Sequence, residues 1–156
     1  MFVCKGNVFR SMTAEYALRR ELGDYPGIRV GSAGTADVPY PVWPEVRDYL
    51  RHRGLDVSGH ARRTLTRAML DEADLAMAMD PAPQVEVQTL FGVSLPLFLR
   101  VCEPNGAASA LPDIEEAVPG YKDNPAATLR HIHATIDRII AATRLLAERL
   151  KENEHG

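Results

Sequence analysis

Residues 2–11 read Phe2-Val3-Cys4-Lys5-Gly6-Asn7-Val8-Phe9-Arg10-Ser11, an apolar pair that leads into a run containing a cysteine, an asparagine and an arginine. Phe2 and Val3 predict the end of a short strand, and residues 11–22 predict a helix that stops at Gly23. Residues 4–11 are therefore predicted to form a loop that connects a strand to the N-terminus of a helix.

The residue types in this loop favour the binding of an anion. Successive backbone N–H groups in such a loop form an anion-binding nest, and the helix N-terminus adds positive potential. The same field favours the thiolate of Cys4, which makes Cys4 the candidate nucleophile. Arg10 offers a planar fork for two phosphoryl oxygens, and the hydroxyl of Ser11 can donate a hydrogen bond to the sulfur. The predicted phosphate-binding residues are Lys5, Gly6, Asn7, Val8, Phe9, Arg10 and Ser11.

Strands and helices alternate along the rest of the chain. Further strands are predicted at residues 28–30, 75–79 and 95–102, and further helices at 45–53, 66–72, 81–91 and from Pro125 onward. Residues 103–127 are predicted to be rich in loops. The alternation indicates an α/β protein with a parallel sheet covered on both sides. Because no repeat or long linker divides the chain, one domain over residues 1–156 is expected.

Composition excludes several classes of protein. Hydrophobic residues make up 46% of the 156 residues and charged residues 25%, which is typical of a soluble globular protein. The formal net charge of −3 argues against a dedicated nucleic-acid binder. No apolar run approaches the roughly 20 residues that span a bilayer, and no signal peptide is recognised. We therefore expect a cytoplasmic protein without a membrane or nucleic-acid partner, with two free thiols.

The loop residues are part of a longer sequence pattern that continues into the predicted helix. The string Cys4-x-Gly6-Asn7-x-x-Arg10-Ser11-x-x-Ala14-Glu15 resembles the signature of the low-molecular-weight protein tyrosine phosphatases. The resemblance continues in Ser32-Ala33-Gly34-Thr35, in Gly59-His60-x-x-Arg63 and in Ala73-Asp74-Leu75 ahead of Met79-Asp80. These landmarks occur in the order and spacing of the family and cover nearly the whole chain.

The resemblance implies a single α/β domain whose four-stranded parallel sheet is flanked by helices on both faces. It implies a reaction in which Cys4 forms a cysteinyl-phosphate that water hydrolyses, while Arg10 and the loop amides bind the equatorial oxygens. In this family Asn7 would support the loop through a hydrogen bond to Ser32. No metal or cofactor is implied. The implied partner is a phosphorylated protein, most naturally one that carries phosphotyrosine, and the expected enzyme is a monomer or weak dimer.

The family also uses a general acid, usually an aspartate followed by proline in a late loop. Asp113 lies in the expected loop but is followed by Ile114, so the pattern is only partly kept. Asp113 is the predicted acid, and the alternatives are Glu115 and Glu116. Asp80-Pro81 has the right residues but follows the predicted strand at 75–79, where a turn is the simpler interpretation.

Aromatic and cysteine positions add further expectations. Tyr40 and Trp43 lie in the loop that forms one wall of the substrate cleft in the family, where they would favour an aryl substrate; packing on the core is the alternative. Tyr121 is a replacement for the aromatic residues that usually follow the acid. Phe9 stands where the family often has a second cysteine, and Cys102 is predicted to be a core residue.

Two other functions remain open at this point. Arsenate reduction on the same scaffold needs additional redox cysteines, and only Cys102 is available. A non-catalytic phosphotyrosine-binding module fits the altered acid loop but not the presence of both Cys4 and Arg10. Turnover of an aryl phosphate separates enzyme from binding module, and thiol-dependent reduction of arsenate identifies the redox alternative.

Overall fold

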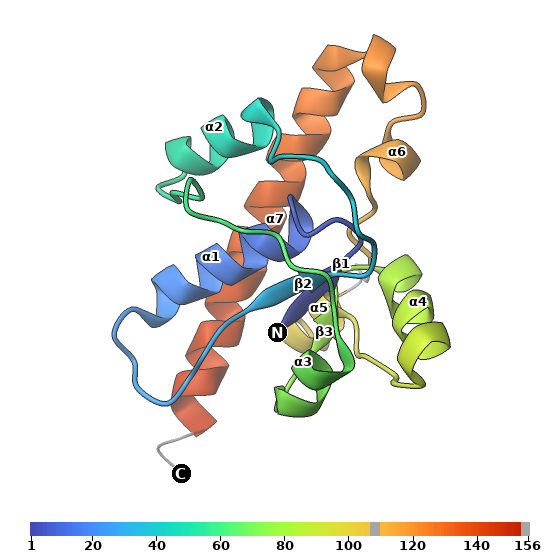
Figure 1. Ribbon diagram of the computed structural model, residues 1–156. Helices are drawn as coiled ribbons and strands as arrows, with labels where there is room; N and C mark the ends of the chain where they lie inside the picture. The colour runs from blue at the N-terminus through green and yellow to red at the C-terminus, as the bar shows by residue number, and fades with distance from the viewer. Residues whose placement is uncertain (107–109, 154–156) are drawn as a thin grey trace.

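Three short parallel strands form the centre of the computed structural model, which describes residues 1–106 and 110–153. Strand β1 (Phe2–Cys4) lies between β2 (Ser32–Gly34) and β3 (Met77–Ala78) (Figure 1). Phe2 pairs with Ser32 on one side and with Met77 on the other. Because all three strands point the same way, their carboxyl ends meet at one edge, where α/β proteins place their ligands.

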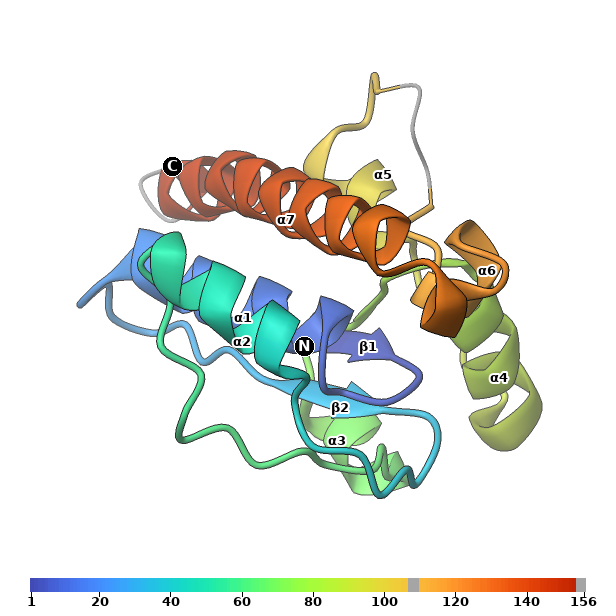
Figure 2. The ribbon, with the colours of Figure 1, turned by 90° about the horizontal axis from the view of Figure 1, so that it is seen from above.

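Helices account for most of the remaining described chain. They are α1 (Arg10–Leu22), α2 (Pro44–His52), α3 (Arg67–Glu72), α4 (Pro81–Phe91), α5 (Phe98–Cys102), α6 (Ile114–Ala117), the 3-10 helix η1 (Tyr121–Asp123) and α7 (Pro125–Asn153). The long helix α7 lies alongside α1, with α2 packed next to both (Figures 1 and 2). Among the described residues, no helix combines the length and apolar character needed to cross a bilayer.

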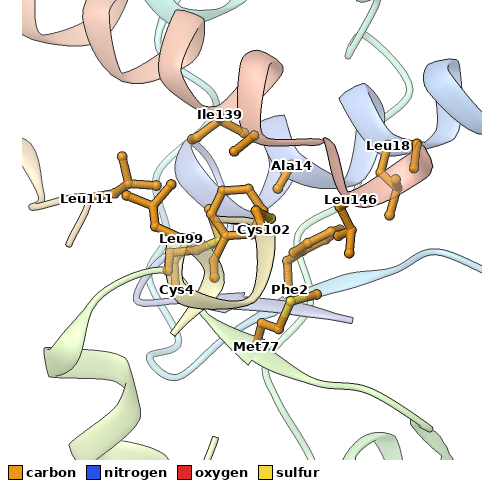
Figure 3. Packing of buried hydrophobic residues seen from close by; sticks show 14 of the residues in the cluster. Phe2, Cys4, Ala14, Leu18, Met77, Leu99, Cys102, Leu111, Ile139 and Leu146 are labelled. Atoms are coloured by element: carbon orange, nitrogen blue, oxygen red, sulfur yellow. The ribbon is translucent and has the colours of Figure 1, made fainter. Parts of the chain in front are cut away.

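The sheet is covered on both faces because successive strand residues point to opposite sides. Phe2, Cys4 and Met77 pack in a cluster with residues of α1, α5 and α7 (Figure 3). Val3 and Ala78 pack in a second cluster with residues of α3 and α4. Full burial of a large apolar side chain such as Phe2 contributes about 1.5–3 kcal/mol, so this alternation fixes the strand register.

The predicted helices at 11–22, 45–53, 66–72 and 81–91 and the helix beginning at Pro125 are confirmed to within about a residue at each predicted end. The predicted strand at 28–30 is wrong, since the second strand is Ser32–Gly34. Phe2 is the first residue of β1 and pairs with Ser32, so the residues before Gly31 lie beyond the end of the neighbouring strand.

The expectation of a four-stranded sheet is also wrong. Where the fourth strand was predicted, at 95–102, the structure has one parallel bridge between Ala78 and Leu97, followed by helix α5. Pro96 accepts a hydrogen bond from the Ala78 N–H but has no N–H of its own, so pairing does not extend. The predicted strand at 75–79 shortens to Met77–Ala78. Residues 103–127 contain α6 and η1 in addition to loops, and 107–109 lie outside the described residues.

An ion pair joins the end of α5 to α7, and it predicts a pH-dependent loss of stability. Both guanidinium NH2 groups of Arg138 donate to the carboxylate of Glu103, and these hydrogen bonds lower the pKa of Glu103 below its ordinary value. A lowered pKa means stabilisation that is present above the ordinary pKa and lost as pH falls through the folded-state pKa. Glu103→Gln should therefore reduce the free energy of unfolding at pH 7 by about 1 kcal/mol.

Urea denaturation of the wild type and of Glu103→Gln between pH 7 and pH 3.5 measures the difference in their free energies of unfolding. This difference should shrink as pH falls below the ordinary glutamate pKa of about 4.3, because the wild type then loses the same interaction. Asp71→Asn, which removes the exposed Arg67–Asp71 pair on α3, is the matched control and should change stability by no more than about 0.5 kcal/mol. A Glu103→Gln effect that is independent of pH would contradict the assignment.

Candidate active site

The loop between β1 and α1 lies at the carboxyl edge of the sheet, with Cys4 at the end of the central strand. The Cys4 sulfur is 2.9 Å from the Ser11 hydroxyl oxygen and 3.3 Å from the backbone nitrogen of Asn7, which donates to it. Both neighbours can donate a hydrogen bond to the sulfur, as a candidate nucleophile requires. Lys5 to Arg10 line the cavity above Cys4, whereas Ser11 lies behind the sulfur.

Asn7 holds the shape of the loop. Its φ of 57° makes it the one described non-glycine residue with a left-handed backbone, a conformation that surrounding contacts must support. The Asn7 side-chain amide donates to Ser11 Oγ at 2.9 Å and to Ser32 Oγ at 2.7 Å. Its amide oxygen accepts from the backbone N–H of Arg63 at 3.0 Å. The hydrogen bond to Ser32 implied by the family resemblance is therefore present.

Further side chains support the loop, some from the string and landmarks quoted in the sequence and one, Arg62, from between His60 and Arg63. The Ser32 hydroxyl donates to the buried carboxylate of Glu15, which extends the chain of polar contacts inward. A ring nitrogen of His60 lies 2.7 Å from the Asn7 carbonyl oxygen. Arg62 donates to the Gly6 carbonyl at 3.2 Å and to that of Ala36 at 2.6 Å. His60 and Arg62 therefore hold the backbone of the loop and of the segment after β2.

Gly34 lets strand β2 approach the loop closely. A side-chain carbon at Gly34 would lie 2.5 Å from the Lys5 carbonyl oxygen, which is impossible without moving the backbone. The adjacent N–H of Thr35 donates to the Cys4 carbonyl at 2.9 Å, and that of Ala36 to the Lys5 carbonyl at 3.0 Å. The Ser32-Ala33-Gly34-Thr35 string therefore serves as a rigid support for the loop.

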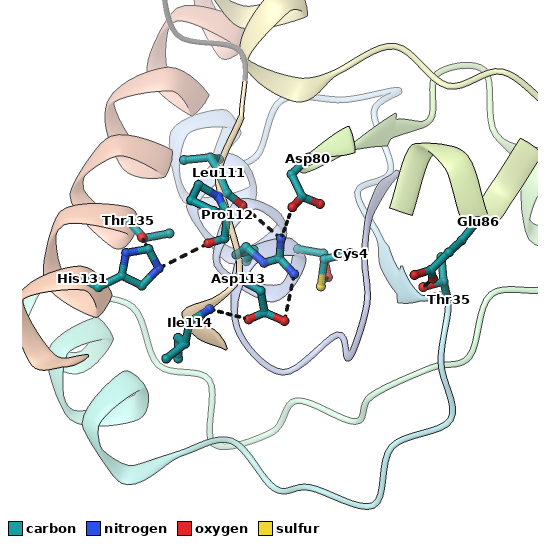
Figure 4. A network of polar contacts seen from close by, with 12 residues as sticks. Cys4, Thr35, Asp80, Glu86, Leu111, Pro112, Asp113, Ile114, His131 and Thr135 are labelled. Carbon is teal, nitrogen blue, oxygen red and sulfur yellow. Dashed lines mark hydrogen bonds and ion pairs between the residues drawn. The ribbon is translucent and has the colours of Figure 1, made fainter. Parts of the chain in front are cut away.

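Arg10 contacts residues from two distant parts of the chain. Its side chain is 3% exposed, and one terminal nitrogen donates to the Leu111 carbonyl at 2.9 Å and lies 3.1 Å from Asp80 Oδ2. The other terminal nitrogen lies 3.4 Å from Asp113 Oδ2 (Figure 4). The guanidinium is thus held in place before any anion enters the cavity.

Asp80 was missed as a partner of Arg10 by the sequence analysis. It does lie at a turn, directly before α4, as expected, but its side chain is 3% exposed and paired with Arg10. Burial raises the pKa of Asp80, and the positive charge of Arg10 opposes that rise. Asp80 Oδ1 has no hydrogen-bond partner among the described residues, and Asp80 does not line the cavity. The Asp80 carboxylate therefore contacts Arg10 without facing the cavity.

Asp113 occupies a different place. It precedes α6, where its Oδ1 accepts from the Ile114 N–H at 2.8 Å, and its side chain is 34% exposed. It lines the cavity together with Glu115, one of the two alternative acids, whereas Glu116 does not. Of the carboxylates considered from sequence, Asp113 is thus the one that both faces the cavity and touches Arg10.

The cavity above the loop has a volume of about 390 Å³ and is lined by aromatic side chains from distant segments. Trp43 and Tyr121 stack with ring centroids 5.8 Å apart and an angle of 23° between their planes. Tyr40 also lines the cavity and is 58% exposed. Tyr40 and Trp43 therefore lie where a cleft wall was expected, and Trp43 packs against the core between α1, α2 and α7 as well.

The second cysteine and the histidines of α7 lie in other surroundings. Cys102 is buried in the core, as predicted, and burial raises the pKa of its thiol to about 12. His133 stacks on Tyr49 at 3.8 Å, whereas a ring nitrogen of His131 lies 3.2 Å from the Pro112 carbonyl oxygen. Within residues 1–106 and 110–153, no group of three histidine, cysteine or carboxylate side chains is arranged to hold a metal.

Comparisons with known proteins agree with this geometry. A sequence model of the family described as low molecular weight phosphotyrosine protein phosphatase matches residues 1–155. EpsP of Ralstonia nicotianae, named a probable low molecular weight protein-tyrosine-phosphatase, is 38% identical over 90 residues, which are 57% of this chain and 60% of EpsP. Etp of Escherichia coli K12, named a low molecular weight protein-tyrosine-phosphatase, is 37% identical over 103 residues, 59% of this chain and 68% of Etp.

The match to EpsP and Etp spans about three fifths to two thirds of their length. A solved structure of YwlE arginine phosphatase from Geobacillus stearothermophilus superposes with a TM-score of 0.78. It is 21% identical and covers 98% of this chain and 92% of the YwlE chain. At this identity the likeness to YwlE concerns the fold.

Proposed function

The chain belongs to the low molecular weight phosphotyrosine protein phosphatase family, and from that premise we propose that it is a protein-tyrosine phosphatase that works through a cysteinyl-phosphate on Cys4. The observation that carries the proposal is the Cys4 sulfur, placed at the floor of a cavity between two hydrogen-bond donors and close to a pre-positioned arginine. This arrangement joins a nucleophile to an anion-binding site.

In the first step the Cys4 thiolate attacks the phosphorus of the substrate. The sulfur–phosphorus bond forms as the bond to the tyrosine oxygen breaks, and the Asp113 carboxyl gives its proton to that oxygen. The fork of Arg10 and the loop N–H groups hold the equatorial oxygens, where charge must be stabilised in the transition state. Ser11 donates a hydrogen bond to the sulfur, and the hydrogen bond between Asn7 and Ser32 keeps the loop in its shape.

In the second step water releases the phosphate. Asp113, now a carboxylate, takes a proton from a water molecule that attacks phosphorus, and the sulfur–phosphorus bond breaks to restore the Cys4 thiolate. Because the Ser11 hydroxyl lies 2.9 Å from the sulfur, it stabilises the departing thiolate. The charge on the transferred group is met by Arg10 and backbone amides, so this scheme needs no metal or cofactor.

The shape of the cleft favours phosphotyrosine over other phosphoesters. Trp43 and Tyr121 form an aromatic pair beside the loop, and Tyr40 stands at the rim, so a flat ring entering the cavity meets aromatic faces. EpsP and Etp are named as tyrosine phosphatases, whereas YwlE is named an arginine phosphatase. Arsenate reduction fits less well, because the buried Cys102 thiol is held protonated.

A phosphopeptide panel tests the proposal. Peptides that carry phosphotyrosine, phosphoserine or phosphoarginine in the same sequence are incubated with the protein, and released phosphate is measured. We expect the phosphotyrosine peptide to be hydrolysed fastest. Faster release from phosphoarginine would reassign the substrate, and binding of phosphotyrosine without any release would favour the non-catalytic module.

The setting of the enzyme is part of the proposal. We place it in the cytoplasm, as one domain over residues 1–156 that acts as a monomer or weak dimer on phosphorylated proteins. The free thiols of Cys4 and Cys102 support a reducing compartment. The sedimentation behaviour of the purified protein measures the oligomeric state.

Peroxide is expected to inactivate the protein in a way that thiol reductants reverse poorly. Phe9 replaces the cysteine that would lie next to Arg10, and a thiol with a pKa of about 12 offers almost no thiolate to capture oxidised Cys4. Cys4 should therefore proceed to the sulfinic acid, seen as a gain of two oxygens in the Cys4 peptide. Full recovery together with a Cys4–Cys102 disulfide would contradict this expectation.

A further inference from the structure

Residues Leu111 to Asp113 form a short segment that is held from two sides (Figure 4). On the cavity side, Arg10 donates to the Leu111 carbonyl at 2.9 Å and lies 3.4 Å from Asp113 Oδ2. On the opposite side, His131 of α7 meets the Pro112 carbonyl at 3.2 Å. The two contacts fall on consecutive carbonyls, so the segment is fixed directly before the proposed acid.

The chemistry of Pro112 decides which group donates the hydrogen bond between Pro112 and His131. Proline has no backbone N–H, so its carbonyl is the main-chain polar group by which Pro112 can be held. A carbonyl only accepts, which requires the hydrogen of the imidazole ring to be on Nε2 of His131. Thr135, one helical turn further along α7, has its hydroxyl oxygen 3.4 Å from the same nitrogen. The ring therefore has a fixed orientation on a long, packed helix.

Burial is the main reason that His131 does not act as a cation. Burial lowers the pKa of His131, and the positive charge of Arg10 lowers it further, while the Pro112 carbonyl and Asp113 oppose these effects. The ring is therefore neutral at pH 7, and its contribution to the segment is a directed N–H rather than a charge next to Asp113. Protonation would add a hydrogen at the other ring nitrogen and leave the contact with Pro112 in place.

From this geometry we propose that His131 is a positioning residue for Asp113, holding the Pro112 carbonyl so that the acid faces the leaving group. The proposal rests on the proposed function, because it assigns to His131 a role in the proton-transfer step. Asp113 is otherwise held by its contact with Arg10 and by its cap on the Ile114 N–H. Both of these fix the carboxylate oxygens, and His131 fixes the main chain that precedes them.

The first test compares two leaving groups. His131→Ala should lower kcat for a phosphotyrosine peptide by about 10- to 100-fold, the scale of a misplaced catalytic group, with KM little changed. Nitrophenyl phosphate, whose leaving group needs little protonation, should lose less than about threefold. His131→Gln, whose amide N–H reaches the same carbonyl, should recover most of the activity. His133→Ala, on another face of the same helix, is the matched control and should leave both rates unchanged.

A double variant separates positioning from general damage. In an Asp113→Asn background, His131→Ala should cause no further loss, because its effect passes through the acid. Equal losses on both substrates, a further loss in the Asp113→Asn background, or no loss at all would overturn the proposal. Thermal unfolding of each variant reports whether the fold is retained.

A readout without turnover keeps this inference distinct from the proposed activity. Amide hydrogen exchange at Ile114, whose N–H is capped by Asp113, should become faster in His131→Ala and return to the wild-type rate in His131→Gln. If the wild type hydrolyses none of the tested phosphoesters, the proposed function fails while this measurement still decides the positioning. Unchanged exchange at Ile114 in His131→Ala would count against His131 even in an active enzyme.

Discussion

Cys4→Ser is expected to abolish phosphate release while the protein still binds inorganic phosphate. The serine hydroxyl is a far weaker nucleophile than a thiolate at neutral pH, so the covalent step is lost. The proposed phosphate site consists of the Arg10 fork and the loop backbone, which the substitution leaves in place. Phosphate release from a phosphotyrosine peptide measures the loss, and the rise in Tm with added phosphate measures the retained binding.

Cys102→Ser is the matched control for this substitution. It replaces the same side chain in a buried position of the core, away from the cavity lining. We expect it to lower stability, because a hydroxyl is buried, and to leave kcat close to that of the wild type. The mechanism would be wrong if Cys4→Ser kept a substantial part of the wild-type rate, or if Cys102→Ser removed turnover in a folded protein.

Local signals predicted the helices well. Pro81 begins α4 and Gly92 ends it with a φ of 68°, so residues 81–91 are bounded by residues with strong backbone preferences. The run at 95–102 had no such boundary, and a short apolar run suits a strand or a buried helix equally. Its outcome depends on how Phe98 and Leu99 pack on the sheet and α7, which is a tertiary contact.

The site, like the fold, has parts that local sequence predicts and parts that depend on tertiary contacts. Cys4 to Ser11 are contiguous, so one string identified the loop and its chemistry. The contact of Asp80 with Arg10 joins residues 70 positions apart and was missed. A signal was available, because β3 neighbours β1 and the carboxyl ends of parallel strands meet at one edge. His60 belongs to a landmark of the family resemblance, whereas His131, whose contact is with the backbone carbonyl of Pro112, carries no comparable signal in the sequence.

The two aspartates that contact Arg10 are expected to affect the rate in different ways when each is replaced by asparagine. Asp113 lines the cavity and is one-third exposed, whereas Asp80 is buried behind Arg10 and does not reach the cavity. From the sequence, Asp80 was interpreted as a turn residue rather than as part of the site. The ion pair changes that interpretation: loss of the Asp80 charge should disturb Arg10, the proposed ligand of the phosphoryl group whatever the leaving group is. Asp80→Asn should therefore slow phosphotyrosine and nitrophenyl phosphate by similar factors.

Asp113→Asn should instead show a strong dependence on the leaving group. A general acid contributes about 10²–10⁴ in rate, and the tyrosine oxygen needs its proton whereas nitrophenolate leaves without one. We expect a loss of that size for the phosphotyrosine peptide and about tenfold or less for nitrophenyl phosphate, measured as kcat for both substrates in the same preparation. If the leaving-group dependence appears in Glu115→Gln and not in Asp113→Asn, the acid is Glu115, which also lines the cavity. If Asp80→Asn alone shows it, the separation of the two carboxylates into an acid and a support for Arg10 is wrong.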